Sequence, residues 1–482
     1  MKLEISANEY VNGIKDGTFT AEEFTARTME QISKLEPKLH AFISVNNDAV
    51  EQARMIDKKI RENEKVGVFY GMPISVKDNI CVKGSRTTCG SKMLQDFVSP
   101  YDATVSSILK SEDATIVGKT NLDEFAMGVA TEFSAFGPTK NPWNTDCVPG
   151  GSSGGSAVSI RALESLLSLG SDTGGSVRNP ASFCSVVGLK PTYGLISRYG
   201  LVSYANSIEQ IGPMGRSVED VAFLLNHIAG KDQNDNTTID NGHQNYLSDL
   251  DAGIQGKRVG IIKEMCKSEG LDKNVESAFR RSVSSFEKLG ANVGEVSLDL
   301  VDYTIAAYYI LTASEAGSNL ARYDNLRYGF DFPQEGYEFK SYISKARKQF
   351  GPEVTRRMIL GGFVPSAGFA GKYLLKALQV KSKLQKEIGE AFKKFDFLIS
   401  PTVPILPFRF GEKTNDPLAM YLADINTATA NLTGVPAISV PFEISNGLPI
   451  GIQIHANRLE EKQILQAAYA LEKTTNLPEV QL

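Results

Sequence analysis

The chain has 482 residues, of which 42% are hydrophobic and 22% charged, a balance that is normal for a folded globular protein with a sizeable core. Its net charge is −5, whereas a protein that grips nucleic acid unaided favours a basic surface. The sequence has no run of about 18 apolar residues, so it does not predict a membrane span.

The cysteines and the N-terminus indicate the compartment. The N-terminal residues lack the basic-then-apolar pattern of a signal peptide. The 5 cysteines are odd in number and form no C-x-x-C pair, which predicts neither a disulfide framework nor a zinc site. We therefore expect a cytoplasmic protein without a metal centre.

Helix and strand signals alternate along the first half of the chain. Residues 20–65 are predicted to be helical, beginning at Thr20 before an acidic first turn. Residues 66–80 are rich in β-branched side chains and predict a strand region. Residues 101–119 predict a helix followed by a strand. This alternation favours an α/β fold with a mixed or parallel sheet.

The second half continues the alternation after a polar interruption. Residues 231–250 are the most polar stretch and predict a surface loop. Residues 352–394 predict a long helical region with many lysines on a solvated face. Residues 437–455 predict two strands around Asn446 and Gly447, a dipeptide that accepts the positive φ angles of a tight hairpin.

These signals predict one domain that covers residues 1–482. Its expected parts are an N-terminal helical segment (1–65), a half with the most distinctive motifs (66–225), the polar surface loop (231–250) and a C-terminal half that completes the sheet and a substrate pocket (256–482).

Two knots of glycine and serine stand in the first half, V-P-G-G-S-S-G-G-S-A at 148–157 and G-S-D-T-G-G-S at 170–176. A flexible linker is disfavoured, because a helix-like apolar run follows the first knot. A phosphate loop is also disfavoured, because neither knot contains the required lysine. A catalytic cradle remains, since glycines let backbone N–H groups approach a ligand. The second knot resembles an oxyanion hole made by the N–H groups of Thr173, Gly174, Gly175 and Ser176.

A serine nucleophile in this cradle needs a base. The histidines lie far from the knots in sequence; they are His40, His227, His243 and His455. The chain also lacks the G-x-S-x-G nucleophile elbow of α/β-hydrolases. A lysine whose pKa is lowered by burial can replace histidine. Lys77 is a candidate because it closes the apolar run P-I-S-V, although an exposed lysine at the end of a strand would give the same pattern.

At this point the motifs resemble those of the amidase signature family. The two knots, followed by G-L-K-P-T-Y-G at 188–194, keep the family's spacing. Further segments are similar to the glutaminase subunits of tRNA-dependent amidotransferases within that family; they include T-N-L-D-E-F-A-M-G (120–128), F-G-P-T-K-N-P-W-N (136–144) and S-E-A-G-S-N-L-A-R-Y-D (314–324). The resemblance implies the amidase signature fold, a large mixed β-sheet with helices on both faces.

The resemblance also implies a Ser–Ser–Lys triad. Ser176 is then the nucleophile, Ser152 the bridging serine after a cis peptide bond with Gly151, and Lys77 the base. Substrate contacts are implied at Tyr308, Arg357 and Asp424, with Arg356 an equally fair choice for the arginine. An arginine and an aspartate suit the carboxylate and ammonium groups of free glutamine.

The same resemblance implies a division of labour. This chain releases ammonia from glutamine and binds no cofactor. A B-type partner subunit, which carries the ATP and tRNA site, uses ATP and Mg²⁺ to amidate Glu-tRNA(Gln), and bacterial complexes usually contain a small third subunit. Asp-tRNA(Asn) as a second acceptor stays open. So do two other classes of protein, a stand-alone amidase acting on neutral amides and an inactive scaffold, although the intact Lys77, Ser152 and Ser176 set disfavours the scaffold.

Overall fold

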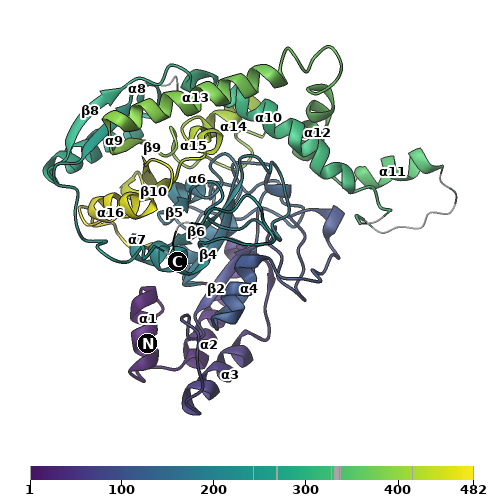
Figure 1. The fold of residues 1–482 in the computed structure, drawn as a ribbon. Helices are drawn as coiled ribbons and strands as arrows, with labels where there is room; N and C mark the ends of the chain where they lie inside the picture. The colour runs from purple at the N-terminus through teal and green to yellow at the C-terminus, as the bar shows by residue number, and fades with distance from the viewer. Residues whose placement is uncertain are drawn as a thin grey trace.

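The computed structural model describes residues 2–240, 242, 244–267, 270–326, 328–330, 336, 338–414 and 416–480. Asn241 and His243 of the predicted surface loop lie outside this set. The described residues form one 11-stranded sheet in the order β1-β3-β2-β4-β6-β5-β10-β11-β9-β7-β8 (Figure 1). Its strands are β1 Phe42–Val45, β2 Pro73–Lys77, β3 Thr115–Thr120, β4 Leu167–Asp172, β5 Val187–Lys190, β6 Gln210–Gly215, β7 Arg258–Ile262, β8 Asn292–Val296, β9 Phe397–Pro401, β10 Ala437–Ser445 and β11 Leu448–His455.

Helices connect these strands. The α-helices are α1 Ala7–Lys15, α2 Ala21–Leu39, α3 Ala49–Arg61, α4 Thr104–Ser111, α5 Gly154–Arg161, α6 Arg178–Cys184, α7 Val218–Ile228, α8 Lys263–Cys266, α9 Lys273–Lys288, α10 Thr304–Asn319, α11 Phe339–Arg347, α12 Pro352–Phe363, α13 Leu374–Lys394, α14 Pro417–Tyr421, α15 Ala428–Thr433 and α16 Glu461–Glu472. Within the described residues, none of these helices has the length and apolar character needed to span a bilayer.

The sheet is mixed, as predicted, and its parallel part positions the chemistry. β2 pairs in parallel with β3 on one side and with β4 on the other, whereas β4 pairs antiparallel with β6. The carboxyl ends of β2 and β4 therefore meet at one edge of the sheet, where Lys77 ends β2 and the second knot follows β4. In open α/β sheets this edge is where ligands bind.

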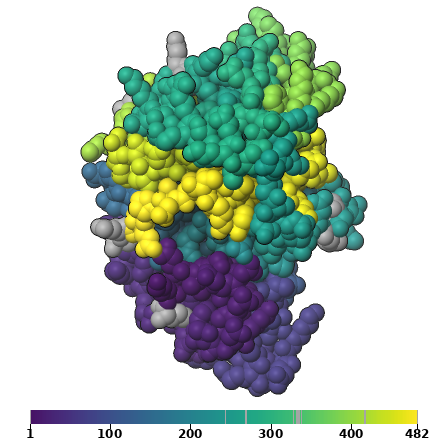
Figure 2. All heavy atoms as spheres, turned by 90° about the vertical axis from the view of Figure 1, so that its left-hand side faces the viewer, coloured from purple at the N-terminus to yellow at the C-terminus, as the bar shows by residue number. Residues whose placement is uncertain are grey.

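Helices cover both faces of the sheet. α7 and α16 contact each other and pack on β6 and β10, burying an apolar cluster that includes Leu224 and Ile464. α5 and α6 contact each other and belong to a separate cluster that includes Val158 and Ala181. α7 also contacts α1, so that segments from the two ends of the chain lie on the same face, as Figure 2 shows.

Local sequence signals predict most of these elements, with two differences. Asn446 and Gly447 have φ angles of 53° and 78° and join β10 to β11, so the predicted hairpin is confirmed. The segment 1–65 is not helical throughout, because β1 lies between α2 and α3 and pairs antiparallel with β3 at the edge of the sheet. The predicted helical region 352–394 is two helices, α12 and α13, separated by turns.

Candidate active site

Lys77 ends β2 with a completely buried side chain. Its Nζ lies within hydrogen-bond distance of four oxygen atoms: Ser152 Oγ at 2.7 Å, Ser153 Oγ at 2.8 Å, Ser171 Oγ at 2.9 Å and the Ser171 carbonyl at 3.3 Å. A neutral amine has two N–H donors and one lone pair, so one of these hydroxyls can donate to it. The exposed strand-end alternative for Lys77 is thereby excluded.

Burial lowers the pKa of Lys77 to about 7, and the carboxylates of Asp123 and Asp172 oppose this shift only in part. Desolvation disfavours the charged ammonium more than these carboxylates stabilise it. A substantial share of the amine is then neutral near pH 7, and a neutral amine is what a general base requires.

The two knots meet beside this amine. Ser152 lies in the first knot just before α5, and its peptide bond with Gly151 is cis, as the resemblance implies. Ser176 lies in the second knot between β4 and α6, and its carbonyl accepts the N–H of Ser153 at 3.1 Å. Ser152 is fully buried, whereas Ser176 is 7% exposed. The innermost members of the set are thus Lys77 and Ser152, with Ser176 nearest to solvent.

The second knot offers a smaller set of backbone donors than the sequence suggests. The Gly175 N–H donates to the Asp172 carboxylate at 2.9 Å, so it is not free for an oxyanion. The N–H groups of Thr173, Gly174 and Ser176 have no acceptor among the described residues. The turn that exposes these three donors has Gly175 at φ 143°, a conformation that side-chain-bearing residues rarely adopt.

A buried ion pair holds the second knot in place. Arg178 donates to both Asp172 carboxylate oxygens at 3.0 Å, and both side chains are fully buried. Arg178 also donates to Gln453, and Asn431 donates to Asp172. Burial alone would raise the pKa of Asp172, but Arg178 and these hydrogen bonds outweigh it and lower the pKa to about 2. The network is therefore ionised and fixes the backbone on both sides of Ser176.

The predicted substrate residues lie on the other side of the cradle. A Cβ at Gly174 would lie 2.5 Å from the Tyr308 hydroxyl, so the Tyr308 ring covers the glycine turn. Asp424 is 5% exposed and is contacted by the Tyr309 hydroxyl at 3.4 Å. Burial raises the pKa of Asp424 to about 8, with Arg357 pulling it back in part. An arriving ammonium group would supply the positive charge that this carboxyl lacks.

The two candidate arginines, Arg356 and Arg357, differ in the exposure of their side chains. The Arg357 side chain is 3% exposed, and its Nε donates to Glu353 at 2.7 Å. The Arg356 side chain is 39% exposed and points toward Glu353 from the outer face of α12. The Arg357 guanidinium also lies within 5.1 to 5.7 Å of three tyrosine rings, those of Tyr204, Tyr309 and Tyr421. Arg357 is therefore the buried arginine of the two, and its charge lowers the pKa of the Asp424 carboxyl.

Sequence reasoning missed several of these residues. Asp172 lies in the second knot and Arg178 follows the knot directly after Val177, and two opposite charges around a glycine-rich turn were a signal for an internal ion pair. Ser153 and Ser171 share the Lys77 amine with Ser152; the first is adjacent to Ser152, and the second lies within the second knot. The three tyrosines around Arg357 come from distant segments; Tyr309 is adjacent to the predicted Tyr308, whereas Tyr204 and Tyr421 were not predicted.

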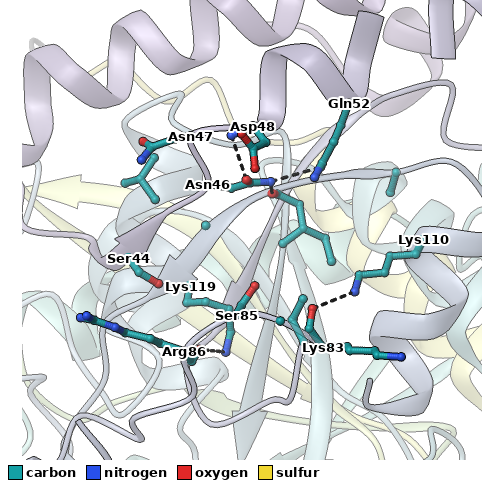
Figure 3. A pocket seen from close by; sticks show the side chains of 16 residues that line it. Ser44, Asn46, Asn47, Asp48, Gln52, Lys83, Ser85, Arg86, Lys110 and Lys119 are labelled. Carbon is teal, nitrogen blue, oxygen red and sulfur yellow. Dashed lines mark hydrogen bonds between the residues drawn. The ribbon is translucent and has the colours of Figure 1, made fainter. Parts of the chain in front are cut away.

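A second polar pocket lies away from these residues, at the β1 edge of the sheet (Figure 3). Its lining includes Lys83, Arg86, Lys110 and Asn46. Figure 3 shows the charged ends of Arg86 and Lys83 pointing to opposite sides, and Lys110 is paired with Asp102 at 2.7 Å. The cations do not converge on one point, and none of the predicted catalytic residues lines this pocket.

Comparisons with known proteins show the family of this chain. The family described as Amidase matches residues 23–465. The chain belongs to the amidase family. This match spans both knots, Lys77 and the three predicted substrate residues.

Curated amidase-family relatives are similar over their whole length. The A-type subunit of glutamyl-tRNA(Gln) amidotransferase from Cenarchaeum symbiosum is 58% identical, with 99% of both chains covered. An A-type subunit of the same amidotransferase from Clostridium acetobutylicum is 47% identical, with 98% of this chain and 99% of its own covered. The crystal structure of the corresponding Thermotoga maritima protein aligns with a TM-score of 0.84 at 39% identity, covering 100% of this chain and 98% of that chain.

The pKa of Lys77 gives a pH prediction. For a simple neutral amide such as propionamide, kcat/KM is expected to rise as pH increases through about 7, because Lys77 loses its proton there and becomes a base. Lys77→Arg is expected to be inactive across the whole range, because a guanidinium stays protonated. Rates measured on both sides of neutral pH check both; an active arginine variant would show that Lys77 supplies only charge.

The buried ion pair gives a stability prediction. Arg178→Met is expected to lower the free energy of unfolding by about 3–5 kcal/mol, because it leaves the Asp172 carboxylate buried without its counter-charge. The matched control is Arg258→Met, whose pair with Asp396 is exposed and whose loss costs about 1 kcal/mol or less. Urea unfolding followed by circular dichroism measures both; equal losses would contradict the assigned role of the buried pair.

Proposed function

We propose that this chain is the glutamine-hydrolysing subunit of a tRNA-dependent amidotransferase, and that Lys77, Ser152 and Ser176 carry out the hydrolysis. The observation that supports this most directly is that Arg357 and Asp424 are both buried and close enough for the Arg357 charge to act on the pKa of Asp424. A site for neutral amides needs neither charge. A site for a free amino acid needs both, one for the α-carboxylate and one for the α-ammonium.

Glutamine is then held at two ends. Arg357 binds the α-carboxylate and Asp424 the α-ammonium, while the Tyr308 ring borders the path to the second knot. The side-chain carboxamide reaches Ser176, the most exposed member of the triad. Holding the α-groups at fixed points orients the carboxamide carbon for attack, which lowers the entropic part of the barrier.

Acylation follows from the hydrogen bonds around Lys77. The neutral amine takes a proton from Ser152, which takes one from Ser176, and the Ser176 oxygen attacks the carboxamide carbon. The resulting oxyanion is stabilised by the N–H groups of Thr173, Gly174 and Ser176, each such donor being worth roughly 3–4 kcal/mol. The protonated amine returns the proton through Ser152 to the leaving nitrogen. The C–N bond breaks and ammonia leaves.

Deacylation repeats the relay with water. Lys77 removes a proton from water through Ser152, the hydroxide attacks the glutamyl ester, and Ser176 leaves as a hydroxyl when the proton returns. The balance is glutamine plus water giving glutamate plus ammonia. The B-type partner subunit receives the ammonia and, with ATP and Mg²⁺, amidates Glu-tRNA(Gln). The net charge of −5 supports leaving tRNA contact largely to that partner.

The proposed setting is a heteromeric complex in the cytoplasm, with a small third subunit as in bacterial assemblies. All 5 cysteines are free, which supports a reducing compartment.

Removing the nucleophile separates the two half-reactions. Ser176→Ala is expected to abolish ammonia release from glutamine, because the variant loses the attacking oxygen and little else. Added ammonium salt is expected to restore amidation of Glu-tRNA(Gln) by the mutant complex. Glutaminase assays and tRNA amidation assays measure these outcomes; ammonia release near the wild-type rate would refute Ser176 as the nucleophile.

Substrate choice is tested at Asp424. Asp424→Asn is expected to lower kcat/KM for glutamine roughly ten- to a hundredfold, the effect of losing one charged hydrogen bond in a desolvated site. Propionamide has no α-ammonium, so its turnover is expected to stay unchanged. Steady-state kinetics on both substrates decide the matter, and equal losses would make Asp424 a structural residue. A wild-type enzyme that prefers propionamide would favour the stand-alone amidase.

A further inference from the structure

Asp123 and Glu124 follow β3, and their carboxyl groups accept hydrogen bonds from two different parts of the candidate active site. Asp123 accepts the N–H of Thr131 at 2.9 Å, and the Thr131 hydroxyl donates to the Gly150 carbonyl at 2.8 Å. Asp123 thereby supports the first knot. Glu124 points the other way and accepts the Gly351 N–H at 2.7 Å.

Gly351 is the N-cap of α12, the helix that carries Arg357. Glu124 is 3% exposed, and its second carboxylate oxygen accepts the hydroxyl of Ser91. The ring of Phe125 packs edge-on against that of Phe350, with the centroids 5.7 Å apart. The start of α12 is therefore attached to the loop after β3 by one hydrogen bond to the Glu124 carboxyl group and one aromatic contact.

This attachment fixes the position of Arg357 along its helix axis. Arg357 follows Gly351 by six residues, which is about 9 Å at the rise of an α-helix. A shift at the start of a rigid helix is carried to its later turns. The segment after β3 thus has two roles. It supports the first knot through Asp123, and it sets the position of Arg357 along the helix axis through Glu124.

We propose that Glu124 is a positioning residue for glutamine recognition, which holds α12 so that the Arg357 guanidinium keeps its distance from the Ser176 cradle. This inference rests on the proposed function, because it assigns Arg357 to the α-carboxylate. Glu124 touches neither substrate nor the reacting atoms, and its effect is on the binding of the α-carboxylate alone.

The chain provides a matched control. Glu132 lines the same surface pocket as Glu124 and accepts the N–H of another glycine, Gly411, also at 2.7 Å. The Gly411 segment carries none of the substrate residues. Gly351 provides an independent variant, because a Cβ at this position would collide with the Glu124 carboxylate and displace it without removing it.

The test is steady-state kinetics of the complex purified with its partner subunits, on glutamine and on propionamide. Glu124→Ala and Gly351→Ala are expected to raise KM for glutamine about tenfold or more, with kcat and the propionamide rate within about twofold of wild type. Glu124→Gln is expected to restore the wild-type KM, because its amide oxygen can accept the Gly351 N–H. Glu132→Ala is expected to match wild type.

Three results would overturn the proposal: an unchanged KM in both Glu124→Ala and Gly351→Ala, equal losses on glutamine and propionamide, or the same KM rise in Glu132→Ala. Failure of the proposed function is seen separately, in a wild-type enzyme that does not prefer glutamine to propionamide.

Discussion

The amine of Lys77 lies at the end of β2, without solvent exposure and among four oxygen atoms. Desolvation makes its charged form costly, and this cost brings the pKa down to about 7. The composition and the surroundings of the first knot are consequences of this burial. The first knot must be rich in glycine and serine, because only small residues leave room for hydroxyls around a buried amine. α5 and the sheet must also keep solvent away from the Lys77 amine.

The second knot needs a different kind of stabilisation. It must present free N–H groups, and a backbone with unpaired donors is unstable unless the neighbouring groups are well bonded. The ion pair between Asp172 and Arg178 stabilises this turn. Asn431 and Gln453 from the C-terminal half form hydrogen bonds with the two charged side chains. The turn of the second knot is thus held by residues that are 253 and 275 positions away from Arg178 in the chain.

The substrate side is built from helices that lie outside this sheet. α10 supplies Tyr308, α12 supplies Arg357, and the segment after α14 supplies Asp424. The proposed recognition groups thus come from other elements than Lys77, Ser152 and Ser176, so the two sets can change independently. In the proposed function, Arg357 and Asp424 add charge recognition without altering Ser176 or its relay. The attachment of α12 to the loop after β3 is then expected to affect substrate choice.

The sequence by itself determined the elements and residues that depend on local chemistry. Turn residues such as Asn446 and Gly447 specify a hairpin through their φ angles, and the spacing of the two knots predicted a set of triad residues through a family resemblance. Only the tertiary structure decided what depends on burial and distance: that Lys77 is desolvated rather than exposed, that Arg357 rather than Arg356 is buried, and that the Gly175 N–H is already bonded. The physical reason is that a lowered pKa, an ion pair or an occupied donor is a property of neighbours, and these neighbours are brought together by the sheet from distant parts of the chain.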